Sequence, residues 1–201
     1  KISFKENEMK DKLCLKMVSI NDLKELWEIS FGPKADLEWM KFNGPYFNDP
    51  VLSWEEFSTG YGKSIVESSM VNAIIVDSRI VGLVTAYWAD GKLKQWLEVG
   101  IVIYDEKMWG KGIGSVALSR WLECQFDQFT YLPHIGFTTW SGNPGMKKIG
   151  EKCGMREEGV IRKVRYLNGI YYDSVKYGIL REEQKKKKKR NLIFQVSLFL
   201  K

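Results

Sequence analysis

The chain has 201 residues, of which 44% are hydrophobic and 13% aromatic, a composition typical of one globular domain with a well-buried core. Its formal charge of +6 is concentrated at one end, because seven positive charges and no acid lie in residues 185–201, so that residues 1–184 carry a formal charge of −1. The high pI therefore gives no reason to expect a nucleic-acid partner.

Cysteine and histidine are too scarce to indicate a metal site. Three isolated cysteines, Cys14, Cys124 and Cys153, favour a reducing compartment over a disulfide framework or a zinc site, and His134 is the one histidine. No signal sequence is evident, and no apolar run reaches the ~18 residues of a membrane span. We therefore expect a cytoplasmic protein with neither a metal nor a membrane partner.

The first part of the chain predicts a strand and two helices. Residues 13–18 predict the strand, and Ser19 or Asn21 caps a helix with apolar residues at helical spacing: Leu23, Leu26, Trp27 and Ile29. Residues 32–50 are rich in glycine, proline and asparagine and predict irregular structure with short helices. Residues 53–61 begin with a capping box, Ser-x-x-Glu, and predict a second helix.

The centre of the chain predicts an antiparallel meander followed by a helix. Three strand-like runs, 72–76, 80–88 and 95–103, are separated by short polar turns. Apolar residues at helical spacing predict the helix over 112–126.

The last part predicts a strand over 134–140, a helix over 144–152 and a hairpin from 159–166 to 171–180. The predicted order is β-α-α-β-β-β-α-β-α-β-β, an α/β fold with one mixed, mostly antiparallel twisted sheet and helices on both faces.

The tail over residues 185–201 has a different character from the domain over 1–184. Lys185 to Arg190 is a block of like charges that we expect to be disordered or extended in isolation. Residues 191–200 are apolar and β-prone.

The most informative segment lies just before the helix over 112–126 and reads Met108-Trp109-Gly110-Lys111-Gly112-Ile113-Gly114-Ser115. Its alternate glycines leave backbone N–H groups uncovered at a helix N-terminus, where the macrodipole favours phosphate oxygens. The spacing matches neither a P-loop nor a dinucleotide-binding fingerprint. Taken alone, the segment fits either a phosphate site or a turn without a ligand.

A second segment supports the first, because Asn143-Pro144-Gly145-Met146 opens a helix that ends in Glu151-Lys152-Cys153-Gly154-Met155. Together the two segments resemble the GCN5-related N-acetyltransferase (GNAT) family. They are most similar to the branch that holds ribosomal-protein-alanine and spermidine acetyltransferases. The family loop, Gln/Arg-x-x-Gly-x-Gly/Ala, corresponds here to Trp109-Gly110-Lys111-Gly112-Ile113-Gly114, with Trp109 in place of the polar residue. The resemblance covers about residues 13–183.

This resemblance implies that acetyl-coenzyme A is the acetyl donor. In the family, the strand before the loop separates from its neighbour and pairs with the pantetheine arm, while the loop amides hold the pyrophosphate. Asn143 matches a position that commonly contacts the cofactor, and a helix N-cap is its simpler role. The implied cofactor-binding residues are Ile101, Val102, Ile103, Trp109, Gly110, Lys111, Gly112, Ile113, Gly114, Ser115 and Asn143.

Amine attack on a thioester needs a proton acceptor, because an ammonium of pKa ~10 is unreactive. Glu98 matches a glutamate often used in the family and is the candidate base; an exposed strand residue or an ion pair is the alternative. A backbone N–H of residues 101–103 would meet the oxyanion.

The general acid departs from the family pattern. Many relatives carry a tyrosine where this chain has Gly150. The coenzyme A thiol, with a pKa near ~8.5 like that of cysteine, can leave as thiolate with modest help. Tyr171 or Tyr172 on the last strand could substitute, with Tyr172 taken as the candidate.

The acceptor pocket is expected between the first helices and the final hairpin. Aromatic residues mixed with carboxylates over 27–61 suit a cationic amine, with Trp39, Tyr46 and Phe47 as candidate contacts. We therefore expect an acetyl-coenzyme A-dependent N-acetyltransferase acting on a polyamine-like or antibiotic amine or on a protein N-terminus. The alternative is a degenerate acyl-coenzyme A-binding sensor of the same fold. A second copy of the chain is a candidate partner.

Overall fold

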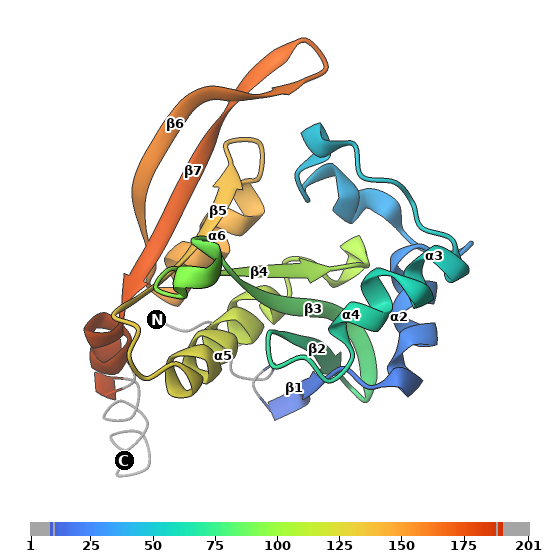
Figure 1. Cartoon of the computed structure of the whole chain (residues 1–201), viewed down its shortest axis with the longest axis horizontal. Helices are drawn as coiled ribbons and strands as arrows, with labels where there is room; N and C mark the ends of the chain where they lie inside the picture. The colour runs from blue at the N-terminus through green and yellow to red at the C-terminus, as the bar shows by residue number, and fades with distance from the viewer. Residues whose placement is uncertain (1–8, 10, 188, 191–201) are drawn as a thin grey trace.

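The computed structural model describes residues 9, 11–187 and 189–190, which form a seven-stranded mixed sheet with helices on both faces (Figure 1). The strand order is β1-β2-β3-β4-β5-β7-β6, and every neighbouring pair is antiparallel except β4 and β5. The strands are β1 (Leu13–Met17), β2 (Val71–Val76), β3 (Arg79–Trp88), β4 (Leu97–Ile103), β5 (His134–Trp140), β6 (Arg156–Leu167) and β7 (Ile170–Leu180). The predicted mixed sheet is confirmed.

The helices follow the predicted order with one addition. They are α2 (Leu23–Ser30), α3 (Trp54–Thr59), α4 (Tyr61–Ile65), α5 (Ile113–Gln128) and α6 (Pro144–Cys153), with short 3-10 turns η1 (Ile20–Asp22), η2 (Leu37–Lys41), η3 (Pro45–Phe47), η4 (Gly91–Leu93) and η5 (Glu106–Met108). The single helix predicted to run through Tyr61 is instead two, because Gly60 adopts a non-helical conformation between α3 and α4.

Local signals account for most of these boundaries. The predicted capping box of α3 is present, with the Ser53 hydroxyl accepting from the Glu56 N–H and the Glu56 carboxylate accepting from the Ser53 N–H. The hairpin turns at Asp77-Ser78 and Asn168-Gly169 have positive φ at both central residues, as tight turns between twisted strands require.

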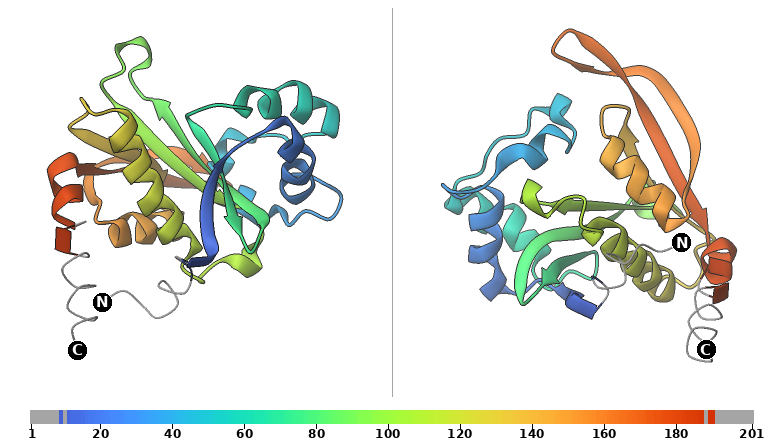
Figure 2. Two further views of the ribbon diagram at one scale, coloured as in Figure 1. Left: turned by 90° about the horizontal axis from the view of Figure 1, so that it is seen from below. Right: turned by 180° about the vertical axis from the view of Figure 1, so that it is seen from behind.

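The two faces of the sheet are covered by different helices (Figure 2). α5 and α6 lie on one face, and α2, α3 and α4 lie on the other. Because side chains alternate along a strand, Leu97 and Val99 of β4 pack in the α5 core, whereas Val102 packs on the opposite face. Glu98 shares the register of Val102 and therefore belongs to the face covered by α2 to α4.

The start of the basic tail is helical. Residues 181–187 and 189–190 form helix. The expectation that Lys185 to Arg190 is disordered or extended concerns the segment in isolation and stays a prediction. The segment is anchored to the domain, since Gln184 is buried and the Lys187 ammonium donates to the Lys152 carbonyl at 3.2 Å. The β-prone residues 191–200 lie outside the described part of the chain.

Arg181 closes the C-terminal end of α5. Its guanidinium donates to the carbonyls of Phe126, Phe129 and Leu132 at 2.9, 2.6 and 2.8 Å, respectively. The first two of these belong to the end of α5 and the residue after it, where carbonyls have no intrahelical donor. The contact therefore fixes the helix that carries the glycine segment to the end of the last strand.

We predict that Arg181→Ala lowers the free energy of unfolding by about 3 kcal/mol, because three carbonyls lose a charged donor. Arg181→Lys keeps the charge but loses the planar guanidinium, so it should lower the free energy of unfolding by less than Arg181→Ala does. Urea unfolding followed by circular dichroism measures both. If the urea midpoint of Arg181→Ala equals that of the wild type, Arg181 does not stabilise the end of α5.

Candidate functional site

The two central strands separate along their length. β4 and β5 pair only at Leu97 with Ile135 and at Glu98 with Gly136, although β4 continues to Ile103 and β5 to Trp140. On its other side, β4 pairs with β3 along the whole length of β4, from Leu97 with Trp88 to Ile103 with Gly82. Beyond Glu98, the backbone groups of β4 that point toward β5 therefore have no strand partner.

The glycine segment forms the start of α5. Gly112 is the N-cap, with φ of 87° and no side-chain cap, and Gly110 has φ of 70° with open space where a Cβ would be. Both conformations favour glycine. The N–H groups of the first helical turn have no intrahelical acceptor, and they face the positive end of the macrodipole.

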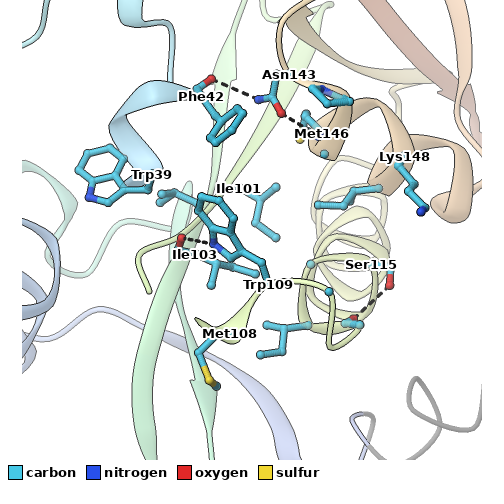
Figure 3. A pocket seen from close by; sticks show the side chains of 18 of the residues that line it. Trp39, Phe42, Ile101, Ile103, Met108, Trp109, Ser115, Asn143, Met146 and Lys148 are labelled. Carbon is cyan, nitrogen blue, oxygen red and sulfur yellow. Dashed lines mark hydrogen bonds between the residues drawn. The ribbon is translucent and has the colours of Figure 1, made fainter. Parts of the chain in front are cut away.

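A cavity of about 450 Å³ opens between the separated strands, the glycine segment and the start of α6 (Figure 3). All the predicted cofactor-binding residues except Lys111 line it: Ile101, Val102, Ile103, Trp109, Gly110, Gly112, Ile113, Gly114, Ser115 and Asn143. Lys111 is exposed, with its ammonium 3.8 Å from the Met108 sulfur. The sequence did not indicate Phe42, Met146 and Lys148, which also line this cavity.

Phe42 bridges the two sides of the cavity. Its carbonyl accepts from Trp140 Nε1 at 3.0 Å and from Asn143 Nδ2 at 3.2 Å, and its ring meets the Trp109 ring edge-on at 5.5 Å (Figure 3). Trp109 Nε1 in turn donates to the Ile103 carbonyl at 2.9 Å. Asn143 Oδ1 accepts from the Met146 N–H, so the predicted N-cap is confirmed, and its contact with a cofactor stays a prediction.

Asp36 ties the same segment to the glycine loop. Its carboxylate accepts from the backbone N–H of Glu106 and Glu38, both at 2.9 Å. These two bonds hold the pKa of Asp36 below its usual value. Residues 36–43 therefore connect the glycine loop at one end with β5 and α6 at the other.

Glu98 lies at the centre of a buried polar cluster. Glu98 is only 3% exposed. Its carboxylate accepts hydrogen bonds from Tyr87 Oη at 2.6 Å, Thr138 Oγ1 at 2.9 Å and Lys176 Nζ at 3.2 Å. Lys176 also lies over the Trp96 ring, 4.7 Å from its centroid. Burial and the adjacent carboxylate raise the pKa of Tyr87. Glu98 is thus in an ion pair and not an exposed strand residue.

A second cavity, of about 630 Å³, lies beside Glu98 on the α2 to α4 face. It shares Trp39, Asn43, Ile101 and Val102 with the first cavity. Thr85 and Gly100, which are paired in register, also line it. Glu98 is two residues from Gly100 on the same face of β4, a separation of about 7 Å along the strand.

The other predicted acceptor and acid residues lie elsewhere. Tyr46 and Phe47 line neither cavity, and both rings contact the Arg165 guanidinium, at 4.8 and 5.5 Å. Tyr46 and Tyr172 each meet the Trp140 ring edge-on, at 5.8 and 4.9 Å. These residues form a cluster that joins η3 to the β6–β7 hairpin.

Gly150 is required by the packing beneath it. A Cβ there would lie 2.7 Å from two atoms of the Phe137 ring, which stacks on Tyr177 at 5.1 Å. Burial and Glu151 raise the pKa of Tyr177 to about 12. Phe137 therefore occupies the space into which a side chain at position 150 would extend.

Sequence reasoning missed the partners of Glu98. Tyr87 is opposite Glu98 in the β3–β4 hairpin, whereas a two-residue turn at Asp90-Gly91 would place Lys94 opposite Tyr87, so counting outward from that turn does not indicate the pair. Thr138 reaches Glu98 through the β4–β5 pairing, and Lys176 does so through the β5–β7 pairing; no local signal specifies either.

The described residues provide neither a cluster of metal ligands nor a membrane-spanning helix. They hold no group of three or more histidine, cysteine, aspartate or glutamate side chains that could bind a metal ion. None of their helices is both long and apolar enough to cross a membrane.

Residues 12–156 match the family described as the acetyltransferase (GNAT) domain, and the chain belongs to that family. Among curated relatives, it is 30% identical over 114 residues to the SPbeta prophage-derived uncharacterized N-acetyltransferase YokL of Bacillus subtilis (strain 168), a match that covers 55% of this chain and 61% of YokL. It is 27% identical over 110 residues to the putative ribosomal N-acetyltransferase YdaF of the same organism, covering 55% of this chain and 58% of YdaF. The chain thus spans about three fifths of these relatives.

Solved structures share the fold. The spermidine N-acetyltransferase from Vibrio cholerae, in complex with CoA and spermine, superposes with a TM-score of 0.68 at 22% identity, covering 87% of this chain and 98% of that one. The aminoglycoside acetyltransferase AAC(6')-Ib, in complex with coenzyme A, gives a TM-score of 0.68 at 15% identity, covering 88% and 99%. At these identities the comparison shows the fold alone.

We predict that Gly150→Ala lowers the free energy of unfolding by about 1–3 kcal/mol, because the stacked Phe137 ring cannot move away. Gly145→Ala, on the same helix with 3.5 Å to its nearest atom, should not destabilise and is the matched control. Adding Phe137→Leu should recover part of the Gly150→Ala loss in a double-mutant cycle of chemical unfolding. Strict additivity would contradict the packing argument.

Proposed function

We propose that the chain is an acetyl-coenzyme A-dependent N-acetyltransferase that acts on a primary amine. The observation that carries the proposal is the glycine segment at the start of α5, which opens into the cavity between the separated strands, close to the buried Glu98. Membership of the acetyltransferase family supports it. So do the fold relatives whose structures contain coenzyme A.

The residues that line the first cavity fit the donor. The uncapped N–H groups at Gly112 to Gly114 suit a pyrophosphate, and the open space at Gly110 lets it approach the backbone. The backbone groups of Ile101 and the N–H of Ile103 point toward β5 without a strand partner, and they suit the amides of a pantetheine arm. When bound, acetyl-coenzyme A supplies the acetyl thioester.

Glu98 is the proposed base, acting through water. A carboxylate has about four lone-pair sites, and three donors already occupy Glu98, which leaves one site for a water molecule. Because Glu98 lines neither cavity, a water molecule in the second cavity would carry the proton from the acceptor ammonium to the carboxylate. We assign to the N–H groups of Ile101 and Ile103 the stabilisation of charge on the acetyl oxygen.

The leaving thiolate needs no side-chain acid in this proposal. Gly150 offers none, and Tyr172 packs on Trp140 away from both cavities. A thiol of pKa near ~8.5 leaves as thiolate at neutral pH and takes its proton from solvent.

Gly112→Glu should reduce the affinity for acetyl-coenzyme A by about 100-fold or more, because a carboxylate would face the pyrophosphate. Isothermal titration calorimetry measures the affinity. Gly91→Glu is the matched control, since Gly91 also has positive φ but is open to solvent and away from the cavity. Micromolar affinity retained by Gly112→Glu would refute the assignment of the loop.

Glu98→Gln should lower kcat about 100-fold at pH values below the pKa of the amine, with a smaller loss at high pH where free amine is abundant. The rate of thiol release, measured at a series of pH values, gives the pH profile of kcat. Thr138→Val removes one hydrogen bond but keeps the carboxylate, so its profile should keep the wild-type shape. A Glu98→Gln profile of unchanged shape would remove Glu98 as base. Binding of acetyl-coenzyme A with no thiol release for any amine would favour the sensor instead.

A further inference from the structure

The second cavity differs from a polycation site in its charge and its walls. On the basis of the proposed function, we propose that the acceptor is an amine with a single positive charge on an apolar body, and not a polyamine. A free arylalkylamine and a peptide with an apolar N-terminal residue both have this chemistry. The experiment below separates them.

Aromatic rings form the walls of the cavity. Phe31, Trp39, Tyr61 and Tyr104 line it, with Trp39 meeting Phe31 at 5.5 Å and Tyr104 at 5.3 Å between ring centroids. Trp39 Nε1 donates to the Ser30 carbonyl at 3.2 Å, which fixes the indole. Such walls remove an apolar body from water, and their faces attract one ammonium.

The cavity provides little negative charge. Asp49 is the one carboxylate among the residues that line it, and Lys41 is the one cation. The Lys41 ammonium is directed to Glu38 at 2.6 and 2.7 Å, and this contact raises the pKa of Lys41. The adjacent Glu98 is already paired with Lys176.

A polyamine would therefore enter with more positive charges than the cavity can pair. One ammonium could pair with Asp49 or be deprotonated at the reaction centre, and the others would lie among aromatic rings without a partner. Removing an unpaired charge from water is costly. An acceptor with one ammonium avoids this cost and gains from the aromatic walls.

The full chain should be assayed with saturating acetyl-coenzyme A by thiol release. The acceptors are 2-phenylethylamine, a tripeptide amide with N-terminal phenylalanine, and spermidine. We expect kcat/KM for at least one of the first two to exceed that for spermidine by about tenfold, because a ring is buried in place of unpaired charge. Which of the two is preferred identifies the source of the amine.

Two neighbouring positions give a matched pair of variants. Asn48 and Asp49 both line the cavity and are exposed, and the positive φ of Asn48 is one that aspartate also tolerates. Asp49→Asn should lower kcat/KM for the single-charge acceptor about fivefold without changing KM for acetyl-coenzyme A. Asn48→Asp adds a carboxylate of equal size and should raise kcat/KM for spermidine about fivefold.

The outcomes separate this inference from the proposed function. Preference for spermidine in the wild type, or an Asn48→Asp variant with unchanged preference, would overturn the inference and leave the acetyltransferase proposal intact. A chain that binds acetyl-coenzyme A but acetylates none of the three acceptors would overturn both.

Discussion

The end of the pairing between β4 and β5 at Glu98 is the constraint on which the rest of the site depends. Backbone groups that are buried without partners are costly, so a sheet that separates at its centre needs a ligand, water or side chains to satisfy them. Here the separated strands form a cavity with the uncapped start of α5 at one end and Glu98 near the other. The two cavities share Ile101 and Val102, where the proposed donor and acceptor would meet.

Residues 36–43 make this separation stable. The Asp36 carboxylate binds the backbone just before the glycine loop, and the Phe42 carbonyl binds Trp140 and Asn143 on the opposite side. The glycine loop has positive φ angles and no side-chain cap, so little within the loop itself fixes its position. The bridge across the cavity therefore supplies order that the loop sequence lacks.

Local signals in the sequence predicted the fold, and the family resemblance indicated the residues that line the first cavity. Long-range packing accounts for what both missed. The capping box of α3, the N-cap at Asn143 and the glycine segment each depend on residues within a few positions of one another. The ion pair of Glu98 with Lys176 joins residues that are 78 positions apart in the sequence. The close packing of Phe137 against Gly150 depends on how α6 lies on β5. The helical start of the tail depends on contacts with α6 that overcome the repulsion of like charges.

The ion pair at Glu98 links the chemistry to the choice of acceptor. Before reaction, Lys176 and Glu98 compensate one another. In the proposed mechanism, Glu98 would lose its charge on taking a proton from the acceptor, and Lys176, 3.2 Å from that carboxylate, would become an uncompensated cation. A second ammonium on the acceptor would then be repelled by Lys176, because like charges disfavour one another. An acceptor whose only charge is removed in the reaction would avoid this repulsion, so the lysine paired with the proposed base would also oppose polycations.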